Sequence, residues 1–118
     1  KRSGYFLPNM DTYVNIIGGL KLSEPAADLA VALALVSSLK DLCVGEDVIA
    51  FGEIGLAGEL RAVNHAEARI REAARLGFRR CILPYHNLKS LTLPPQEYGI
   101  RLYGVRTVRN AVNALEKE

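Results

Sequence analysis

Arginines crowd into one short stretch of the chain. Guanidinium groups bind phosphates through charge and paired hydrogen bonds, so such a cluster is a candidate for contact with a nucleic-acid backbone. A second interpretation is a solvated helix face whose positive charge is offset by Glu67 and Glu72. The DNA-binding candidates are Arg69, Arg71, Arg75, Arg79 and Arg80. Arg61 precedes them, and Arg101, Arg106 and Arg109 form a second set.

Hydroxyl and amine side chains that could form a nucleophile and its base are present, but no pattern supports a pair. A serine hydrolase needs a hydroxyl within hydrogen-bond reach of a base, and a lysine base must be desolvated to be neutral. A dyad would have to combine Ser23, Ser37 or Ser38 with Lys21 or Lys40. The spacing of these residues favours none of the combinations.

The most informative segment is Gly-Glu-Ile-Gly-Leu-Ala-Gly-Glu-Leu-Arg-Ala-Val at 52–63. It closely resembles the segment that precedes the catalytic lysine of Lon-type proteases. Upstream, Glu-Pro-Ala-Ala-Asp at 24–28 resembles the Lon segment that carries the serine nucleophile. The resemblance puts Ala26 at the serine position and Glu67 at the lysine position. A methyl group cannot attack a carbonyl and a carboxylate cannot replace the lysine, so we expect no catalytic residues and no peptidase activity.

The chain is also similar, along nearly its whole length, to the C-terminal domain of the bacterial RadA/Sms family of DNA repair ATPases. The segments that carry this resemblance are 11–19, 24–30, 34–38, 51–61 and 72–80. The Lon-like domain of the ComM family shares the glycine-rich hairpin but not the segment at 24–28. The resemblance implies an α/β (α+β) fold like domain 2 of ribosomal protein S5, with a mixed sheet and two main helices.

The resemblance further implies that residues 1–118 form a single Lon-protease-like domain, excised from the C-terminal end of a larger ATPase. That parent would be a bacterial cytoplasmic protein that uses ATP, Mg and zinc, forms a hexameric ring and processes branched DNA. For this chain it implies a non-proteolytic scaffold of the ring, with DNA as a further partner. Two alternatives are a Lon-like peptidase with an unrecognised dyad and the Lon-like domain of a ComM-type helicase.

The composition sets limits on this chain's own ligands. Its 118 residues suffice for one domain with a core, and its net charge of +2 does not by itself indicate nucleic-acid binding. No Walker A motif and no set of four cysteines is present, so we expect neither ATP nor structural zinc to bind. His65 and His86 fall in different elements, and we expect no metal; Cys43 and Cys81 are expected to be buried thiols. No signal peptide or long uncharged apolar run indicates a membrane partner.

The secondary-structure pattern predicts alternating strands and helices. Asn64 and Glu67 have the types and spacing of a capping box at the start of one helix, with Gly77 at its end. Thr107 is the expected N-cap of the last helix, which runs to 115. Strands are expected at 5–7, 12–17, 47–51, 80–84 and 100–104, with a hairpin through Gly55 and Gly58, a helix at 26–40 that is buried on most sides, and a loop at 91–96.

Overall fold

The structure is a computed structural model that describes residues 25–40 and 47–116. The strands expected at 5–7 and 12–17 lie outside these residues, as do Lys21, Ser23 and Cys43. The described helices are η2 (Pro25–Ala27), α2 (Asp28–Lys40), α3 (Ala66–Arg75), α4 (Tyr85–Lys89), η3 (Pro95–Tyr98) and α5 (Val108–Glu116). The described strands are β1 (Val48–Ala50), β2 (Glu53–Ile54), β3 (Leu60–Arg61), β4 (Arg80–Pro84) and β5 (Arg101–Val105).

A three-stranded parallel sheet, in the order β1-β4-β5, forms the centre of the described fold. β4 pairs with β1 from Val48↔Arg80 onward, and with β5 from Arg80↔Arg101 to Pro84↔Val105. Cys81, Ile82 and Leu83 of β4 are almost fully buried, as expected for a strand covered on both faces. The expected α/β fold is therefore confirmed.

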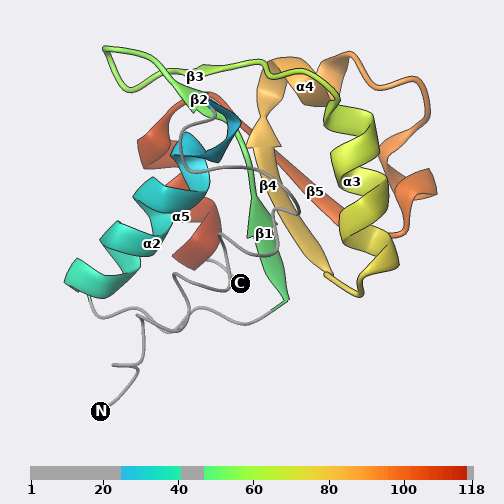
Figure 1. The fold of residues 1–118 in the computed structure, drawn as a ribbon, viewed down its shortest axis with the longest axis horizontal. Coiled ribbons are helices and arrows are strands. Elements are labelled where there is room, and N and C mark those ends of the chain that lie inside the picture. The colour runs from blue at the N-terminus through green and yellow to red at the C-terminus, as the bar shows by residue number, and fades with distance from the viewer. Residues whose placement is uncertain (1–24, 41–46, 117–118) are drawn as a thin grey trace.

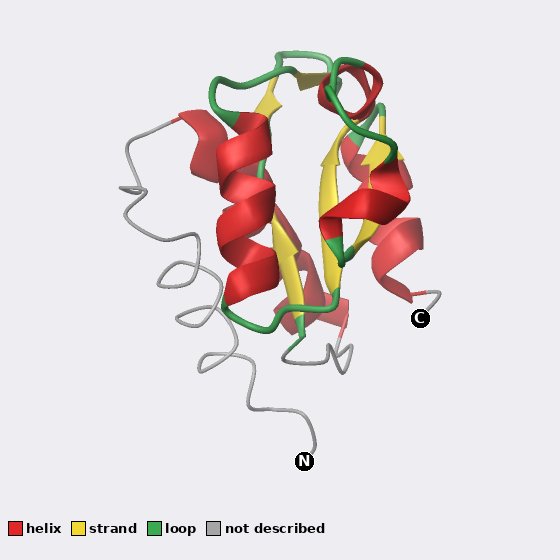
Figure 2. Ribbon diagram, turned by 90° about the vertical axis from the view of Figure 1, so that its right-hand side faces the viewer, coloured by secondary structure: helices red, strands yellow, loops and turns green. Residues whose placement is uncertain are grey.

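Helices flank this sheet on two sides. Figure 1 shows α2 and α5 on one side of the strands and α3 on the other, with α4 at the end where β4 finishes. In the view turned by 90°, the strands run side by side and α3 lies along them (Figure 2). Crossover connections of this kind are what parallel strands require. The largest fully buried side chains include Phe51, Leu29, Leu33, Ile70, Ile82 and Leu83.

The glycine-rich segment forms the expected hairpin. β2 and β3 pair antiparallel, with Glu53 opposite Arg61 and Ile54 opposite Leu60. Gly58 has a φ of 84°, a conformation that favours glycine in a turn. The backbone N–H of Gly58 donates to the carbonyl of Gly55 at 3.0 Å, which closes the turn.

The capping box predicted at the start of α3 is wrong. The helix begins at Ala66, and the residue before it, His65, adopts a left-handed conformation with φ 62° and makes no side-chain cap hydrogen bond. The carboxylate of Glu67 is engaged by side chains of a different segment rather than by the backbone of Asn64. The end of the helix is as expected, since Gly77 follows it with φ 97° and donates to the carbonyl of Ala74 at 3.1 Å.

Other expectations need correction around the helices. Of the four α-helices in the described residues, α2, α3 and α5 were predicted and α4, which contains His86, was not. Helix α2 was expected to be buried on most sides, but Leu35 and Leu39 are exposed. The predicted N-cap of α5 is confirmed, because Thr107 Oγ1 accepts a hydrogen bond from the Asn110 N–H at 3.0 Å.

Helix α4 packs closely on β5 at Gly104. A Cβ added at Gly104 would lie 2.6 Å from Leu88 Cδ2 and 3.3 Å from the Cα of Tyr85. We predict that Gly104→Ala lowers the free energy of unfolding by roughly 1–3 kcal/mol, because it overpacks this contact. Chemical denaturation measures the change. The cost should fall in a Leu88→Ala background, and an equal cost in both backgrounds would contradict this packing explanation.

Candidate functional site

Ala26, which the resemblance to Lon proteases puts at the serine position, lies in η2 beside the end of β1. The Gly52 N–H donates to the Ala26 carbonyl at 2.9 Å, and the Leu29 N–H donates to the Gly52 carbonyl at 3.0 Å. Asp28 Oδ2 accepts a hydrogen bond from the Ile54 N–H at 3.1 Å. These contacts hold residues 25–28 against the hairpin, so described parts of two segments that resemble the Lon family lie together. Ala26 itself is buried.

A hollow of about 340 Å³ adjoins Ala26. Its ionisable lining residues are Glu53, His65 and Arg69. The described residues that line it include no serine, threonine, cysteine or lysine, so they provide no nucleophile with a lysine base. The complete described lining is Pro25, Ala26, Glu53, Ala62, Val63, Asn64, His65 and Arg69.

Glu67, which the same resemblance puts at the lysine position, does not line this hollow. Its Oε2 atom accepts hydrogen bonds from Thr92 Oγ1 at 2.7 Å, Tyr98 Oη at 2.9 Å and Arg71 Nη2 at 2.9 Å. The hydrogen bond from Thr92 is the largest of the effects that lower the pKa of Glu67, followed by those from Arg71 and Tyr98. Tyr98 Oη also accepts from the Leu93 N–H at 3.2 Å. Glu67 thus ties the first turn of α3 to the segment 92–98.

Two described members of the alternative dyads, Ser37 and Lys40, are engaged elsewhere. The Ser37 hydroxyl is buried and donates to the Leu33 carbonyl of its own helix at 2.8 Å. Lys40 Nζ lies 3.7 Å from a carboxylate oxygen of Glu116. Ser38 is exposed on α2. Among the residues that the structure places, the pairing of Ser37 with Lys40 therefore has no geometric support.

The structure separates the five arginines proposed to bind DNA. Arg71 pairs with Glu67, and Arg75 pairs with Glu72 on the same helix. The Arg75 hydrogen bond lowers the pKa of Glu72, and both arginines are largely exposed. Arg69 Nε donates instead to the Asn64 carbonyl at 3.0 Å. On α3, this arrangement favours the interpretation of a solvated face with offset charge.

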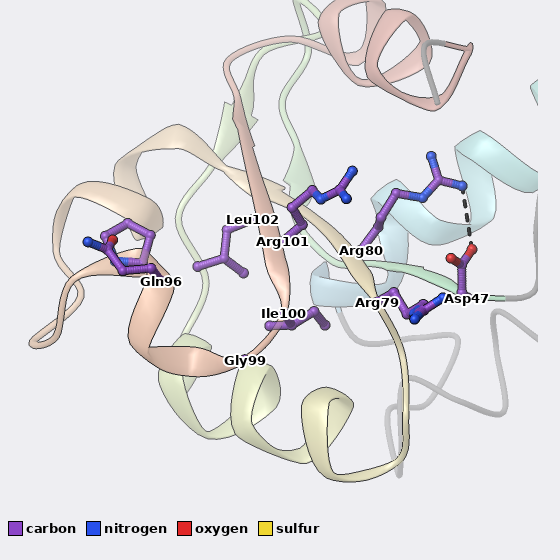
Figure 3. Close-up of a pocket in the computed structure, with 9 residues that line it drawn as sticks. Asp47, Arg79, Arg80, Gln96, Gly99, Ile100, Arg101 and Leu102 are labelled. Carbon is purple, nitrogen blue, oxygen red and sulfur yellow. Dashed lines mark hydrogen bonds and ion pairs between the residues drawn. The ribbon is translucent and has the colours of Figure 1, made fainter.

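Arg79 and Arg80 lie at a second hollow, of about 840 Å³, where β4 and β5 begin (Figure 3). Arg101 joins them because it is the register partner of Arg80 across the parallel strands. Arg80 Nη2 is 3.5 Å from Asp47 Oδ1, and the Arg80 side chain is only 14% exposed. The lining residues are Asp47, Arg79, Arg80, Pro95, Gln96, Gly99, Ile100, Arg101 and Leu102.

No group of three or more His, Cys, Asp or Glu side chains among the described residues could hold a metal ion. Cys81 is buried as expected, and burial raises the pKa of its thiol to about 12. Arg106, counted in the second arginine set, lies with its guanidinium 4.1 Å from the ring centroid of Tyr85. Within the described ranges, none of the helices is long and apolar enough to cross a membrane.

Comparison with known proteins gives matches to one family model and to several curated proteins. The family model described as "Subunit ChlI of Mg-chelatase" matches residues 1–87. The chain is 41% identical to the DNA repair protein RadA of Salmonella typhimurium over 98% of its length, and 46% identical to RadA of Streptococcus pneumoniae over 95%. RadA of Escherichia coli is 40% identical over 98%. The chain spans about a quarter of these relatives, namely 24%, 26% and 24% of their lengths.

The hydrogen bonds of Glu67 predict a pH-dependent contribution to stability. Because its pKa is lowered in the folded state, the contribution is present above the ordinary value of 4.5 and is lost as the pH falls through the lowered pKa. Glu67→Gln should therefore reduce the melting temperature at neutral pH, and the difference from wild type should shrink in acid. Glu97→Gln, at an exposed position of η3, is the control and should have little effect. A difference that does not change with pH would contradict this role of the ionised carboxylate.

Proposed function

The chain belongs to the family whose model is described as subunit ChlI of Mg-chelatase and is similar over 95–98% of its length to RadA, and from this we propose that it is a non-proteolytic Lon-like domain of a DNA repair protein. The similarity to RadA favours a RadA-type parent over a ComM-type helicase. The parent would act in recombinational repair on branched DNA, with ATP, Mg and zinc bound by its other parts. Its location would be the bacterial cytoplasm.

The observation that carries the non-proteolytic part is the chemistry of the two catalytic positions. Ala26 supplies only a methyl group, and Glu67 directs its carboxylate to Thr92 and Tyr98. A carboxylate that accepts three hydrogen bonds is stabilised in its ionised form. It serves as an acceptor that joins two segments of the domain, which is a structural task.

We predict that the chain hydrolyses neither unfolded casein nor fluorogenic peptides above the buffer rate. The reason is the absence of a nucleophile at Ala26 and of a base at Glu67. Release of fluorescent product measures the activity. Ser37→Ala and Ser38→Ala variants are assayed beside the wild-type chain to detect an alternative nucleophile. Cleavage that persists through repurification and disappears in Ser23→Ala, Ser37→Ala or Ser38→Ala would reveal a different nucleophile and overturn the proposal.

A scaffold role in a ring of identical subunits is the second part of the proposal. Leu35 and Leu39 lie one turn apart on α2 and are exposed, and Leu56 is fully exposed at the tip of the β2–β3 hairpin. Apolar side chains grouped on a helix face are suited to contact with another protein surface. A neighbouring copy of the same domain would cover them in the ring.

We predict that deletion of this domain from the longer protein reduces the hexameric fraction in mass photometry. Replacing the exposed apolar pair by Leu35→Gln/Leu39→Gln should act in the same direction, because it removes apolar area from the interface. Leu93→Gln, at an exposed leucine of another segment, is the matched control. Unchanged hexamers after deletion of the domain would exclude the scaffold role.

DNA contact is a second candidate function for this domain. Arg71 and Arg75 lie one turn apart on the exposed side of α3, where a phosphate backbone could approach them. Each is offset by a neighbouring glutamate, so DNA would have to compete with Glu67 and Glu72. Such contacts would be independent of sequence and sensitive to salt.

We predict that Arg71→Glu/Arg75→Glu weakens DNA binding by the longer protein and lowers its salt dependence, by roughly one unit of slope for each phosphate that the variant no longer neutralises. Fluorescence anisotropy over a salt series measures both quantities. Glu72→Gln provides a control of opposite sign, because it removes the competitor of Arg75 and should strengthen binding. If all three proteins bind DNA equally, α3 is a solvated face and this role should be dropped.

A further inference from the structure

The tip of the β2–β3 hairpin presents a fully exposed apolar side chain. Leu56 is the most exposed of the large apolar residues in the described part of the chain, and its neighbour Ala57 is exposed as well. The backbone N–H of Leu56 has no hydrogen-bond partner among the described residues. A leucine in this setting leaves its apolar area in water, and burial of that area in another surface is favourable.

Hydrogen bonds hold this tip in one conformation. The Ala57 N–H donates to Glu59 Oε1 at 3.0 Å, and the Gly55 N–H donates to the Glu59 carbonyl at 2.8 Å. The Val108 N–H donates to the Gly58 carbonyl at 3.0 Å, which fastens the hairpin to the start of α5. Binding through a segment that is already ordered costs little conformational entropy. The tip is therefore suited to insertion into a matching hollow.

The hollow that adjoins Ala26 has a size and an apolar lining that suit an aliphatic side chain. Its volume of about 340 Å³ lies at the lower end of the range for ligand sites. Its apolar side chains come from η2 and from the connection between β3 and α3, and they belong to Pro25, Ala26, Ala62 and Val63. An inserted leucine would exclude water from this lining.

The polar side chains of the same hollow lack partners in the described part of the chain. Glu53 and Arg69 are only partly exposed, yet neither forms an ion pair with another described residue. Within the described ranges, the Arg69 guanidinium donates through Nε alone, to the Asn64 carbonyl at 3.0 Å, and the Asn64 side chain makes no hydrogen bond. Partly buried polar groups without partners are unfavourable, so a surface that supplies the missing donors and acceptors would be bound.

The hairpin tip complements these polar groups. The carboxylate of Glu53 can accept the free N–H of Leu56, and the Arg69 and Asn64 side chains can donate to the carbonyl groups of the tip. The Glu59 carboxylate is partly exposed beside the tip, and its charge is opposite to that of Arg69. The tip and the hollow thus match in apolar surface, in hydrogen-bonding groups and in charge.

The two surfaces lie on different sides of the domain. In Figure 1, the loop between β2 and β3 extends at the upper left, and α3, whose start borders the hollow, lies at the right. Because Leu56 is fully exposed, it does not fill the hollow of its own copy. A contact between two different surfaces of identical chains is head-to-tail, and repetition of such a contact closes a ring when the rotation allows it.

We propose that Leu56 of one copy inserts into the Ala26 hollow of the next copy in the ring. This contact rests on the scaffold role proposed above and assigns the residues that carry it. The leucine side chain packs on the apolar lining, and the backbone of the tip pairs with Glu53, Asn64 and Arg69. The methyl group of Ala26 is part of that lining, so the residue that supplies no nucleophile serves the contact between copies.

The test is photo-crosslinking in the longer protein. The photoreactive residue p-benzoylphenylalanine replaces Leu56, and isotopically heavy and light copies are assembled together, irradiated and digested. Mass spectrometry identifies the joined peptides, and a heavy peptide joined to a light one proves contact between copies. The same photoreactive residue in place of Leu76, an exposed leucine at the end of α3, is the matched control.

We expect position 56 to join to residues 25–26 or 62–69 of another copy, and position 76 not to join to them. Ala62→Trp fills the hollow at an exposed position and should lower the yield of this crosslink at least about tenfold, the effect of losing the burial of one leucine. Leu93→Trp should leave the yield unchanged, and circular dichroism verifies that both variants are folded. Crosslinks that avoid the hollow, or a yield that Ala62→Trp does not change, would overturn the proposal.

The crosslink separates this contact from the scaffold role on which it rests. If deletion of the domain reduces the hexamers but position 56 does not join to the hollow, the scaffold role stands and the proposed contact is wrong. If position 56 joins to the hollow although deletion leaves the hexamers unchanged, the contact stands and the scaffold role is excluded.

Discussion

The pairing of β4 with a parallel strand on each side is the constraint on which the other features depend. At the carboxyl end of β4, Pro84 lies against Gly52, because a Cβ added at Gly52 would be 3.2 Å from the Cγ atom of Pro84. The Gly52 N–H in turn donates to the Ala26 carbonyl. At the amino end, the same strand places Arg80 beside Arg101. Ala26 and the larger hollow, which is lined by Arg79, Arg80 and Arg101, are therefore held at opposite ends of one strand.

Glu67 connects the first turn of α3 to the wall of the second hollow, the one of about 840 Å³. It accepts a hydrogen bond from Tyr98, and the next residue, Gly99, lines the hollow together with Pro95 and Gln96. Gly99 has φ 74°, a left-handed conformation that favours glycine, so the chain can turn there from η3 into β5. Glu67 thus joins two segments of the domain, and its loss would loosen the segment that closes one side of the hollow.

Local sequence signals were sufficient for features that depend on local interactions. The limits of the strand at 80–84 and the cap at Thr107 follow from short-range chemistry, and both agree with the structure. The left-handed conformation of His65 was not predicted, because Asn64 and Glu67 on either side of it have the residue types and spacing of a capping box. The pairing of Arg80 with Arg101 was missed because register between parallel strands depends on packing of the whole sheet, which no local pattern reports. Two arginines placed at the first positions of successive strands were the available signal.

The most direct test of a structural role for Glu67 is a double-mutant cycle with Tyr98, measured by chemical denaturation at neutral pH. Glu67→Ala and Tyr98→Phe remove the two ends of one hydrogen bond, which is 2.9 Å long. If Glu67 anchors the segment 92–98 through Tyr98, the double variant should lose less stability than the sum of the two single variants. A parallel cycle of Glu72→Gln with Tyr98→Phe should be additive. Additive losses in the Glu67 cycle as well would contradict the anchoring role and leave Glu67 an ordinary surface residue.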